Sequence, residues 1–492
     1  MIPANEIVLK DFHMTTNQDS IYADGCLVTT MRNISPHYSQ GLMVPTAEAV
    51  SRNTATSDID SGVTAIVPLD VTKVYVFTGD GKCYLFNDTT GAYTLKRTLA
   101  PGTGSAVVYN ATVFGAYMYY AMEDKLGRMD LATETFNDTW DSFTKGTDTT
   151  THVMQICNRD LYIADAELIA IVDSTGVFTA NALDIDPDYD ARALYTLDNK
   201  LLIGASPKAT TSSYKHYFSR VYTWNTWSVS FDTDTVVPEP LIHGFMYVQG
   251  QLYILAQGQK VKIYGYGDPN ASLYCEIPQG TVPTQGYKYA TVYPSSVTYI
   301  DGKWYFGLGC PVSVSSSEKF PCGIYTFHAR NAGDPPTVQI EHSIPYYNTN
   351  DPTVSAFPAI SFVPGYFLLF GYTSTNPTVT KQNGLAKVLT SVNPTASFRT
   401  GVIDLGRRLQ KTFTIEVPVA QKSNDSTMSL TVYGNGSAAS TFGSSLTYDS
   451  DRMLFRCPVR IPAYVTAQFE ITISTANQQL GAVPESINIL FD

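Results

Sequence analysis

The fold is decided by the stretch Met246-Tyr247-Val248-Gln249-Gly250-Gln251-Leu252-Tyr253-Ile254-Leu255, which holds two apolar strands joined by a tight polar turn. Gln249-Gly250 supplies the positive φ angles that a two-residue hairpin turn needs. Similar hairpins return around Asp198-Asn199 and around Asp301-Gly302. Their flanking strands are nearly continuous apolar runs, as expected where neighbouring sheets cover both faces.

The hairpin belongs to a unit that recurs about seven times within residues 61–391. Equivalent positions in successive units are Ile66, Val107, Met154, Leu194, Tyr247, Val297 and Ile360. Their spacing lies near the roughly 40 to 50 residues of a propeller blade. The longer steps contain inserts rich in Pro, Thr, Ser and Gly, at residues 205–216, 278–290 and 330–352. The sequence therefore predicts a β-propeller of about seven blades; a row of β-sandwiches is the alternative.

The pattern changes near Val392-Asn393-Pro394. Beyond this point apolar and polar residues alternate strictly, as in the stretch from Phe413 to Val419 and the stretch from Phe469 to Ile473. Such alternation is typical of antiparallel strands with one buried face and one wet face. We expect an all-β chain: an extended N-terminal segment (residues 1–60), the propeller (61–391) and a C-terminal antiparallel β-sandwich (396–492).

Composition limits the classes of function. Among 492 residues only 15% are charged, against about 25% in an average soluble domain. The net charge is −12, and the chain has no Lys- or Arg-rich run, which argues against a surface that grips nucleic acid or anionic membrane. A channel wall along which DNA slides without specific binding remains compatible with this balance.

The N-terminus has no basic segment followed by an apolar stretch, so no secretory signal is expected. The most apolar stretch, Ile360 to Tyr372, is short and contains Pro364 and Gly365. It cannot span a bilayer. We therefore expect synthesis in the cytosol and, for a protein that works outside the cell, delivery as part of an assembly.

Neither the cysteines nor the histidines stand at metal-ligand spacing, and we predict no metal, no cofactor and no catalytic residues. The cysteines are Cys26, Cys83, Cys157, Cys275, Cys310, Cys322 and Cys457; the histidines are His13, His37, His152, His216, His243, His328 and His342. Scattered cysteines usually pack as small buried residues. Cys310 and Cys322 are the one pair close enough in sequence to be considered for a disulfide.

Two clusters of residues are candidate binding sites. Asp184, Asp186, Asp188 and Asp190 alternate as Ca²⁺ ligands do, but the Gly and Glu of an EF-hand loop are replaced by Tyr189 and Tyr195. We interpret this stretch as a polar loop between blades.

Tyr222, Trp224 and Trp227 could stack on a sugar, although packing within a blade is the favoured interpretation. A glycosidase carboxylate pair gathered from separate blades would leave no trace in the sequence. We predict that the protein is not an enzyme.

Two stretches outside the repeats resemble a known family. The first runs from Ala23 to Ile34 and continues with Gly41-Leu42-Met43-Val44-Pro45; the second runs from Phe398 to Arg408 and contains Thr400-Gly401 and Asp404. Both are similar to segments of phage tail nozzle proteins (tail tubular protein B-like) and related propeller-bearing virion proteins. In these proteins the first segment precedes the propeller and the second leads into a terminal β-sandwich. This chain shows no obvious inserted platform domain.

The resemblance implies a structural virion protein of a short-tailed phage, assembled in the host cytoplasm. It further implies an oligomeric ring, six-fold by analogy, around the DNA exit path and in contact with other tail proteins such as adaptor and fibres. Two alternatives are a propeller that recognises cell-surface glycan and a glycan hydrolase with carboxylates at the central channel.

Overall fold

The structure is a computed structural model. It describes residues 6–10, 28–32, 34–35, 44–45, 47–51, 59, 61–146, 152–208, 218–258, 261–267, 269–277, 292–309, 323–329, 332–333, 335–342, 354–356, 359–363, 367–374, 383–392, 395–400, 402–405, 410–421, 425–434, 441–462, 466–475 and 483–491. Cys310 and Cys322, the pair considered for a disulfide, lie outside these residues.

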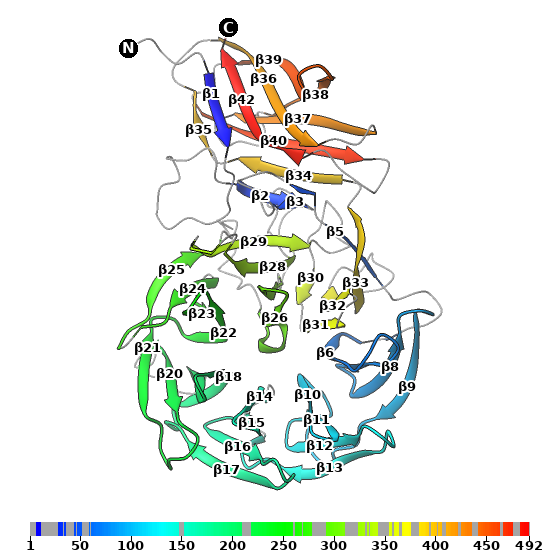
Figure 1. Ribbon diagram of the computed structural model, residues 1–492, viewed down its shortest axis with the longest axis vertical. Coiled ribbons are helices and arrows are strands. Elements are labelled where there is room, and N and C mark those ends of the chain that lie inside the picture. Colours follow the sequence, from blue (N-terminus) through cyan, green and yellow to red (C-terminus); the bar gives the residue numbers. More distant parts are fainter. Residues whose placement is uncertain are drawn as a thin grey trace.

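Seven small antiparallel sheets surround a common centre (Figure 1). Blade one contains β6 (Val63–Pro68), β7 (Val74–Thr78), β8 (Lys82–Asn87) and β9 (Ala92–Thr98), and blade two β10 (Asn110–Phe114), β11 (Tyr117–Ala121), β12 (Lys125–Asp130) and β13 (Phe136–Ser142). Blade three contains β14 (Met154–Cys157), β15 (Asp160–Asp165), β16 (Leu168–Val172) and β17 (Phe178–Asp184), and blade four β18 (Tyr189–Leu197), β19 (Lys200–Pro207), β20 (Ser219–Trp224) and β21 (Thr233–Val237). Blade five contains β22 (Leu241–Val248), β23 (Gln251–Gln257), β24 (Val261–Gly265) and β25 (Ser272–Glu276), and blade six β26 (Thr298–Ile300), β27 (Lys303–Leu308), β28 (Gly323–His328) and β29 (Thr337–His342).

The predicted hairpin turns join the first and second strands of their blades. Gln249 and Gly250 have φ angles of 50° and 81°, and Asp301 and Gly302 have 48° and 84°. Asp198 and Asn199 also have positive φ. These angles match the left-handed conformation that the turn residues were expected to supply, so the repeat is confirmed at the level of its turns.

The seventh blade is closed by a strand from the start of the chain. It contains β30 (Val354–Ala356), β31 (Ile360–Val363), β32 (Phe367–Ser374) and β33 (Asn383–Val392), and its outer strand is β5 (Ala47–Ser51). In β5, Ser51 pairs with Ala386 and Ala49 with Val388. This pairing joins residues from opposite ends of the propeller, and the predicted count of seven blades is confirmed.

The C-terminal module is antiparallel, as predicted, and its two layers belong to one strongly curled sheet that forms a half-barrel. It contains β34 (Thr395–Thr400), β35 (Ile403–Asp404), β36 (Gln410–Gln421), β37 (Ser426–Gly434), β38 (Thr441–Asp449), β39 (Leu454–Pro462), β40 (Thr466–Thr475), β41 (Val483–Pro484) and β42 (Ser486–Phe491). Strand β38 links the layers, because Leu446 pairs with Met428 in β37 whereas Thr447 pairs with Arg456 in β39. The predicted alternation places Phe413, Ile415 and Val417 of β36 in the buried core.

Strands from the N-terminal segment belong to both parts of the molecule. β1 (Glu6–Lys10) pairs with β42, and β2 (Val28–Arg32) pairs with β34 (Figure 1). The β3 (Ile34–Ser35) and β4 (Val44–Pro45) hairpin follows, and β3 contacts β29 of blade six. The sequence-based domain limits at residues 60, 391 and 396 stay predictions.

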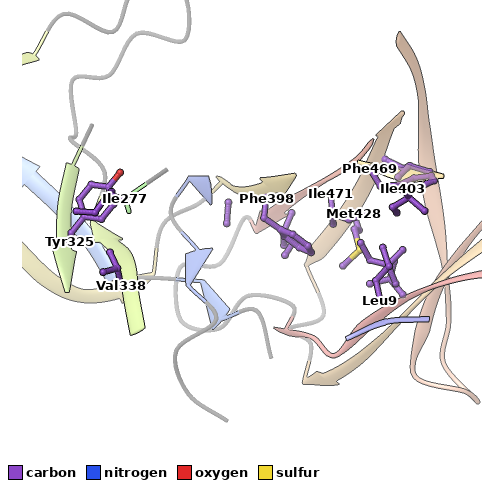
Figure 2. Close-up of a cluster of buried hydrophobic side chains, with 14 of the residues drawn as sticks. Leu9, Ile277, Tyr325, Val338, Phe398, Ile403, Met428, Phe469 and Ile471 are labelled. Carbon is purple, nitrogen blue, oxygen red and sulfur yellow. The ribbon is translucent and has the colours of Figure 1, made fainter. Parts of the chain in front are cut away.

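A continuous apolar cluster extends from blades five and six into the curled sheet. Figure 2 shows Ile277, Tyr325 and Val338 on the propeller side, and a second group from the curled sheet that includes Leu9 of β1. Ile277, Tyr325 and Val338 are fully buried. The core therefore does not stop at the boundary that the change of sequence pattern suggested. No helix among the described residues is long and apolar enough to cross a membrane.

Candidate functional site: the central cavity

The inner strands of the blades surround a cavity of about 330 Å³. The innermost strands β6, β10, β14, β18, β22 and β26 each stand at the end of their sheet, so one edge of each has no neighbouring strand within that sheet. All seven blades contribute to the lining, which is made by Ala65, Ile66, Asn110, Ala111, Val153, Met154, Gln155, Ala193, Leu194, Tyr195, His243, Gly244, Phe245, Pro294, Ser295, Val297, Thr298, Tyr299, Trp304, Ala359 and Ile360.

The lining of this cavity includes an apolar ring with one residue from each blade. In each blade the innermost strand pairs with the next strand, and the ring residue lies three positions before the last paired residue of the innermost strand. The ring consists of Ala65, Ala111, Met154, Leu194, Phe245, Val297 and Ile360. Met154, Leu194, Val297 and Ile360 are among the equivalent positions that the sequence repeat predicted. The other three predicted positions are displaced along the chain from the ring residue of their blade. The displacement is one residue for Ile66, two for Tyr247 and four for Val107.

An aromatic corner forms part of the wall and comes from blades four and six. The ring centroids of Tyr195 and Trp304 are 5.8 Å apart, and those of Tyr299 and Trp304 are 5.3 Å apart. The Trp304 indole Nε1 donates a hydrogen bond to the backbone oxygen of Tyr247, at 3.0 Å. Since Tyr299 is 57% exposed whereas Trp304 is buried, the corner extends from the interior to the surface.

Tyrosine hydroxyls from three blades gather at this corner. Burial raises the pKa of Tyr195, and the neighbouring Tyr247 and Tyr299 raise it further. Tyr247 is 38% exposed, so it reaches the surface as Tyr299 does. The three residues belong to blades four, five and six, and the sequence contains them only as part of the repeat.

His243 is the one titratable nitrogen base among the described residues of the lining. Its Nε2 lies 2.7 Å from the Oε1 of Gln257, and the residue is buried. Burial lowers the pKa of His243 to about 4, against the favourable hydrogen bond of Gln257, and Arg192 lowers it further. The ring is therefore neutral near pH 7. No Asp, Glu, Lys or Arg is among the residues of the described part of the chain that line the cavity.

The aspartates between residues 184 and 190 do not converge. Asp190 is buried, and one of its carboxylate oxygens accepts a hydrogen bond from Arg192 at 3.2 Å. The Asp186 carboxylate accepts one from the backbone N–H of Asp188 at 3.0 Å. Within the described part of the chain, no group of three or more His, Cys, Asp or Glu residues is arranged to hold a metal ion.

The aromatic trio of blade four divides between core and surface. Tyr222 and Trp224 are buried, and Trp224 makes an edge contact with Tyr162 of blade three at 5.6 Å. Trp227 is 85% exposed. Packing within and between blades, the favoured interpretation, therefore accounts for two of the three residues.

The described cysteines are separate and buried: Cys83, Cys157, Cys275 and Cys457. Burial raises the pKa of Cys275 to about 12, which makes its thiol inert at neutral pH. Among the histidines, His152, His243 and His328 are buried, and His342 lies in β29. Cys26, Cys310, Cys322, His13, His37 and His216 lie outside the described residues.

Comparison with known proteins identifies no family for this chain. No family model and no curated protein matches the chain. It is similar to the structure of U3-55K (10% identity, TM-score 0.44, covering 70% of this chain and 98% of that one). It is also similar to the WD40 β-propeller domain of Doa1 (9%, 0.44, 70% and 95%) and to the β-propeller domain of Myceliophteria thermophila Cps50 (Swd1) (11%, 0.42, 68% and 99%). The seven-bladed architecture itself rests on the strand pairing described above.

Proposed function

We propose that the protein is a structural component of a phage tail, without enzymatic activity. In this proposal copies of the chain form a nozzle-like ring around the DNA exit path, six-fold by analogy, and contact other tail proteins such as adaptor and fibres. It would act in the virion after assembly in the host cytoplasm. One observation carries the proposal: the two stretches that resemble phage tail propeller proteins lie side by side as paired strands.

The pairing joins β2 with β34. Val28 pairs with Thr400, and Met31 pairs with Phe398. Thr400 is fully buried, and its hydroxyl oxygen accepts a hydrogen bond from the backbone N–H of Phe469 at 3.0 Å. Two short motifs far apart in sequence thus serve one structural element, which supports reading them together.

The position of this element suits a rigid building block. β2 and the adjoining β3 both contact β29 of blade six, while β2 extends the curled sheet. The same N-terminal segment also closes the propeller through β5. The segment therefore connects both parts, and relative motion of the two parts would disturb strand pairing.

Charge and chemistry agree with a conduit. With a net charge of −12 and few charged residues, the surface is expected to repel the DNA backbone instead of binding it. Glycosidases use two carboxylates about 5 to 9.5 Å apart, and none of the described residues that line the cavity has a carboxylate. These features favour the structural role over the glycan hydrolase.

Sedimentation velocity of the purified full chain tests the proposal, alone and with the connector proteins encoded beside its gene. We expect a monomer or small oligomer that converts into a discrete larger species with a connector protein, and no shift when linear duplex DNA is added. A species that stays monomeric in every mixture would overturn the proposed ring. Tight, salt-dependent binding to DNA would overturn the proposed conduit.

A further inference from the structure

We infer that the central cavity is a binding site for one small, uncharged, polyhydroxylated ring, of the class of a neutral monosaccharide. This inference goes beyond the proposed tail function and does not depend on it. It rests on the size of the cavity, its lack of charge, and the chemistry of its mouth.

Size restricts the ligand. A volume of about 330 Å³ lies at the lower end of the roughly 300 to 1,000 Å³ of small-molecule pockets. A volume of this size does not enclose a long chain of sugars. One ring, or the terminal ring of a longer glycan, fits this space.

Charge restricts the ligand as well. Among its described residues the lining carries no Asp, Glu, Lys or Arg, and His243 is neutral near pH 7 because burial lowers its pKa to about 4. A charged ligand would lose its hydration without gaining a partner of opposite charge, which is strongly unfavourable. Phosphorylated, sulfated and acidic sugars are therefore expected to be excluded.

The lining still offers hydrogen bonds. The Asn110 amide and the Thr298 hydroxyl both line the cavity, and neither has a hydrogen-bond partner among the described residues. In addition, the free edges of the inner strands carry backbone N–H and C=O groups that have no sheet partner. These groups suit a ligand that has many hydroxyls and disfavour a purely apolar one.

The aromatic corner provides the apolar contact surface of the proposed sugar site. The ring centroids of Tyr195 and Tyr299 each lie within 6 Å of that of Trp304. The hydroxyls of Tyr195, Tyr247 and Tyr299 have no hydrogen-bond partner in the described part of the chain. Rings that expose both an apolar face and a polar tip are suited to ligands with the same dual character.

The exposed Trp227 is a less suitable sugar site because the polar groups around it are already engaged. The Asn225 side-chain oxygen accepts hydrogen bonds from the backbone N–H groups of Trp227 and Ser228, at 2.8 and 3.0 Å. The Asn225 amide donates to Asp232 at 3.1 Å. Trp227 is thus the matched control for an aromatic residue on the same propeller.

Saturation-transfer NMR on the full chain tests the inference with glucose, galactose, mannose and rhamnose at millimolar concentration, and with glucuronate as the charged control. We expect transfer to at least one neutral sugar and none to glucuronate. Tyr299→Ala should weaken binding by about three- to tenfold, the equivalent of one aromatic contact. Trp227→Ala should leave it unchanged. Asn110→Ala removes a different contact and serves where Tyr299→Ala does not fold, as judged by near-ultraviolet circular dichroism.

Three results would overturn the inference: no transfer to any neutral sugar, equal transfer to glucuronate, or loss of binding in Trp227→Ala with retention in Tyr299→Ala. The last result would move the site to the outer loop of blade four. None of them concerns ring formation, so the failure of this site and the failure of the proposed tail function are separate outcomes.

Discussion

The ring of His152 joins blade three to blade two, because its Nε2 lies 2.8 Å from the backbone oxygen of Glu123. Its Nδ1 lies 2.8 Å from the backbone oxygen of Ala164, and the ring stacks on Phe143. Both contacts end on acceptors, and a neutral imidazole has only one N–H. Burial lowers the pKa of His152, whereas the two carbonyl oxygens and Asp165 oppose that effect. Burial outweighs them, so the pKa of His152 is lowered overall and the ring is neutral near pH 7, with one N–H for the two carbonyl oxygens.

We therefore predict that ¹⁵N NMR will find only one ring nitrogen of His152 protonated near neutral pH. His152→Phe should keep the stack on Phe143 but remove the ring's hydrogen bond to a carbonyl oxygen, which should lower the free energy of unfolding by about 1 to 3 kcal/mol. Urea unfolding followed by fluorescence measures this loss. Two protonated nitrogens would contradict the assignment, and an unchanged midpoint in His152→Phe would show that the ring does not hold the blades together.

Protonation of Glu167 should lower the free energy of unfolding in acid. Burial disfavours its charge, but hydrogen bonds from Lys145 and Lys208 outweigh that effect and lower the pKa of Glu167 to about 2. The Lys208 Nζ lies 2.6 Å from Glu167 Oε2. Since the pKa is lower in the folded than in the unfolded chain, the stabilisation is complete above about pH 4.5 and disappears as pH falls toward 2.

Glu167→Gln should therefore flatten the fall in stability between about pH 5 and pH 3. Urea unfolding across this range measures the slope for the wild type, for Glu167→Gln and for the exposed control Glu485→Gln. Equal slopes for all three proteins would mean that the Glu167 ion pairs do not contribute.

Gly371 lies where blade seven packs closely against blade one. A Cβ at residue 371 would lie 2.7 Å from the Cβ of Val63 and 2.9 Å from its backbone oxygen. Gly371→Ala should therefore destabilise the protein by about 1 to 3 kcal/mol through overpacking. Gly265→Ala is the matched control, because its nearest contact, the Ser272 hydroxyl, is at an ordinary 3.5 Å. Thermal unfolding should shift in the first variant and stay nearly constant in the second.

Arg399 holds β34, the strand that pairs with β2, against its other neighbours in the curled sheet, because its side chain contacts Glu470 of β40 and Tyr433 of β37. Its guanidinium lies 2.6 Å from Glu470 and 3.7 Å from the centre of the Tyr433 ring. The Tyr433 hydroxyl donates to the same carboxylate at 2.7 Å. Arg399→Met should lower the free energy of unfolding by about 1 to 3 kcal/mol, whereas Arg456→Met, at an exposed position on β39, should change it little. An equal effect of the two substitutions in urea unfolding would argue against a specific role for Arg399.

The sequence predicts the parts of this fold that local chemistry determines. Asp301-Gly302 and Gln249-Gly250 adopt the expected turns, and the alternation around Phe413 identifies a half-buried strand. The β5–β33 pairing could not be predicted from the sequence, because Ser51 and Ala386 are far apart in the chain and no local pattern in β5 indicates its partner. The curl of the C-terminal sheet was equally hidden, since one strand, β38, changes partner midway.

The cavity illustrates the same limit. Tyr195 and Tyr299 stand in ordinary positions of the repeat, and only the closing of the ring brings them to one corner. An apolar ring position such as Leu194 can be predicted from periodicity, because it recurs in every blade. The residues that could distinguish a ligand differ between blades, so no repeat marks them.

Negative-stain electron microscopy of the purified full chain at rising concentration, with and without a connector protein, tests the proposed tail role most directly. We expect closed rings with an opening wide enough for a DNA duplex. In each ring every subunit should show a round propeller and a smaller second lobe. Single two-lobed particles at every concentration and in every mixture would contradict it.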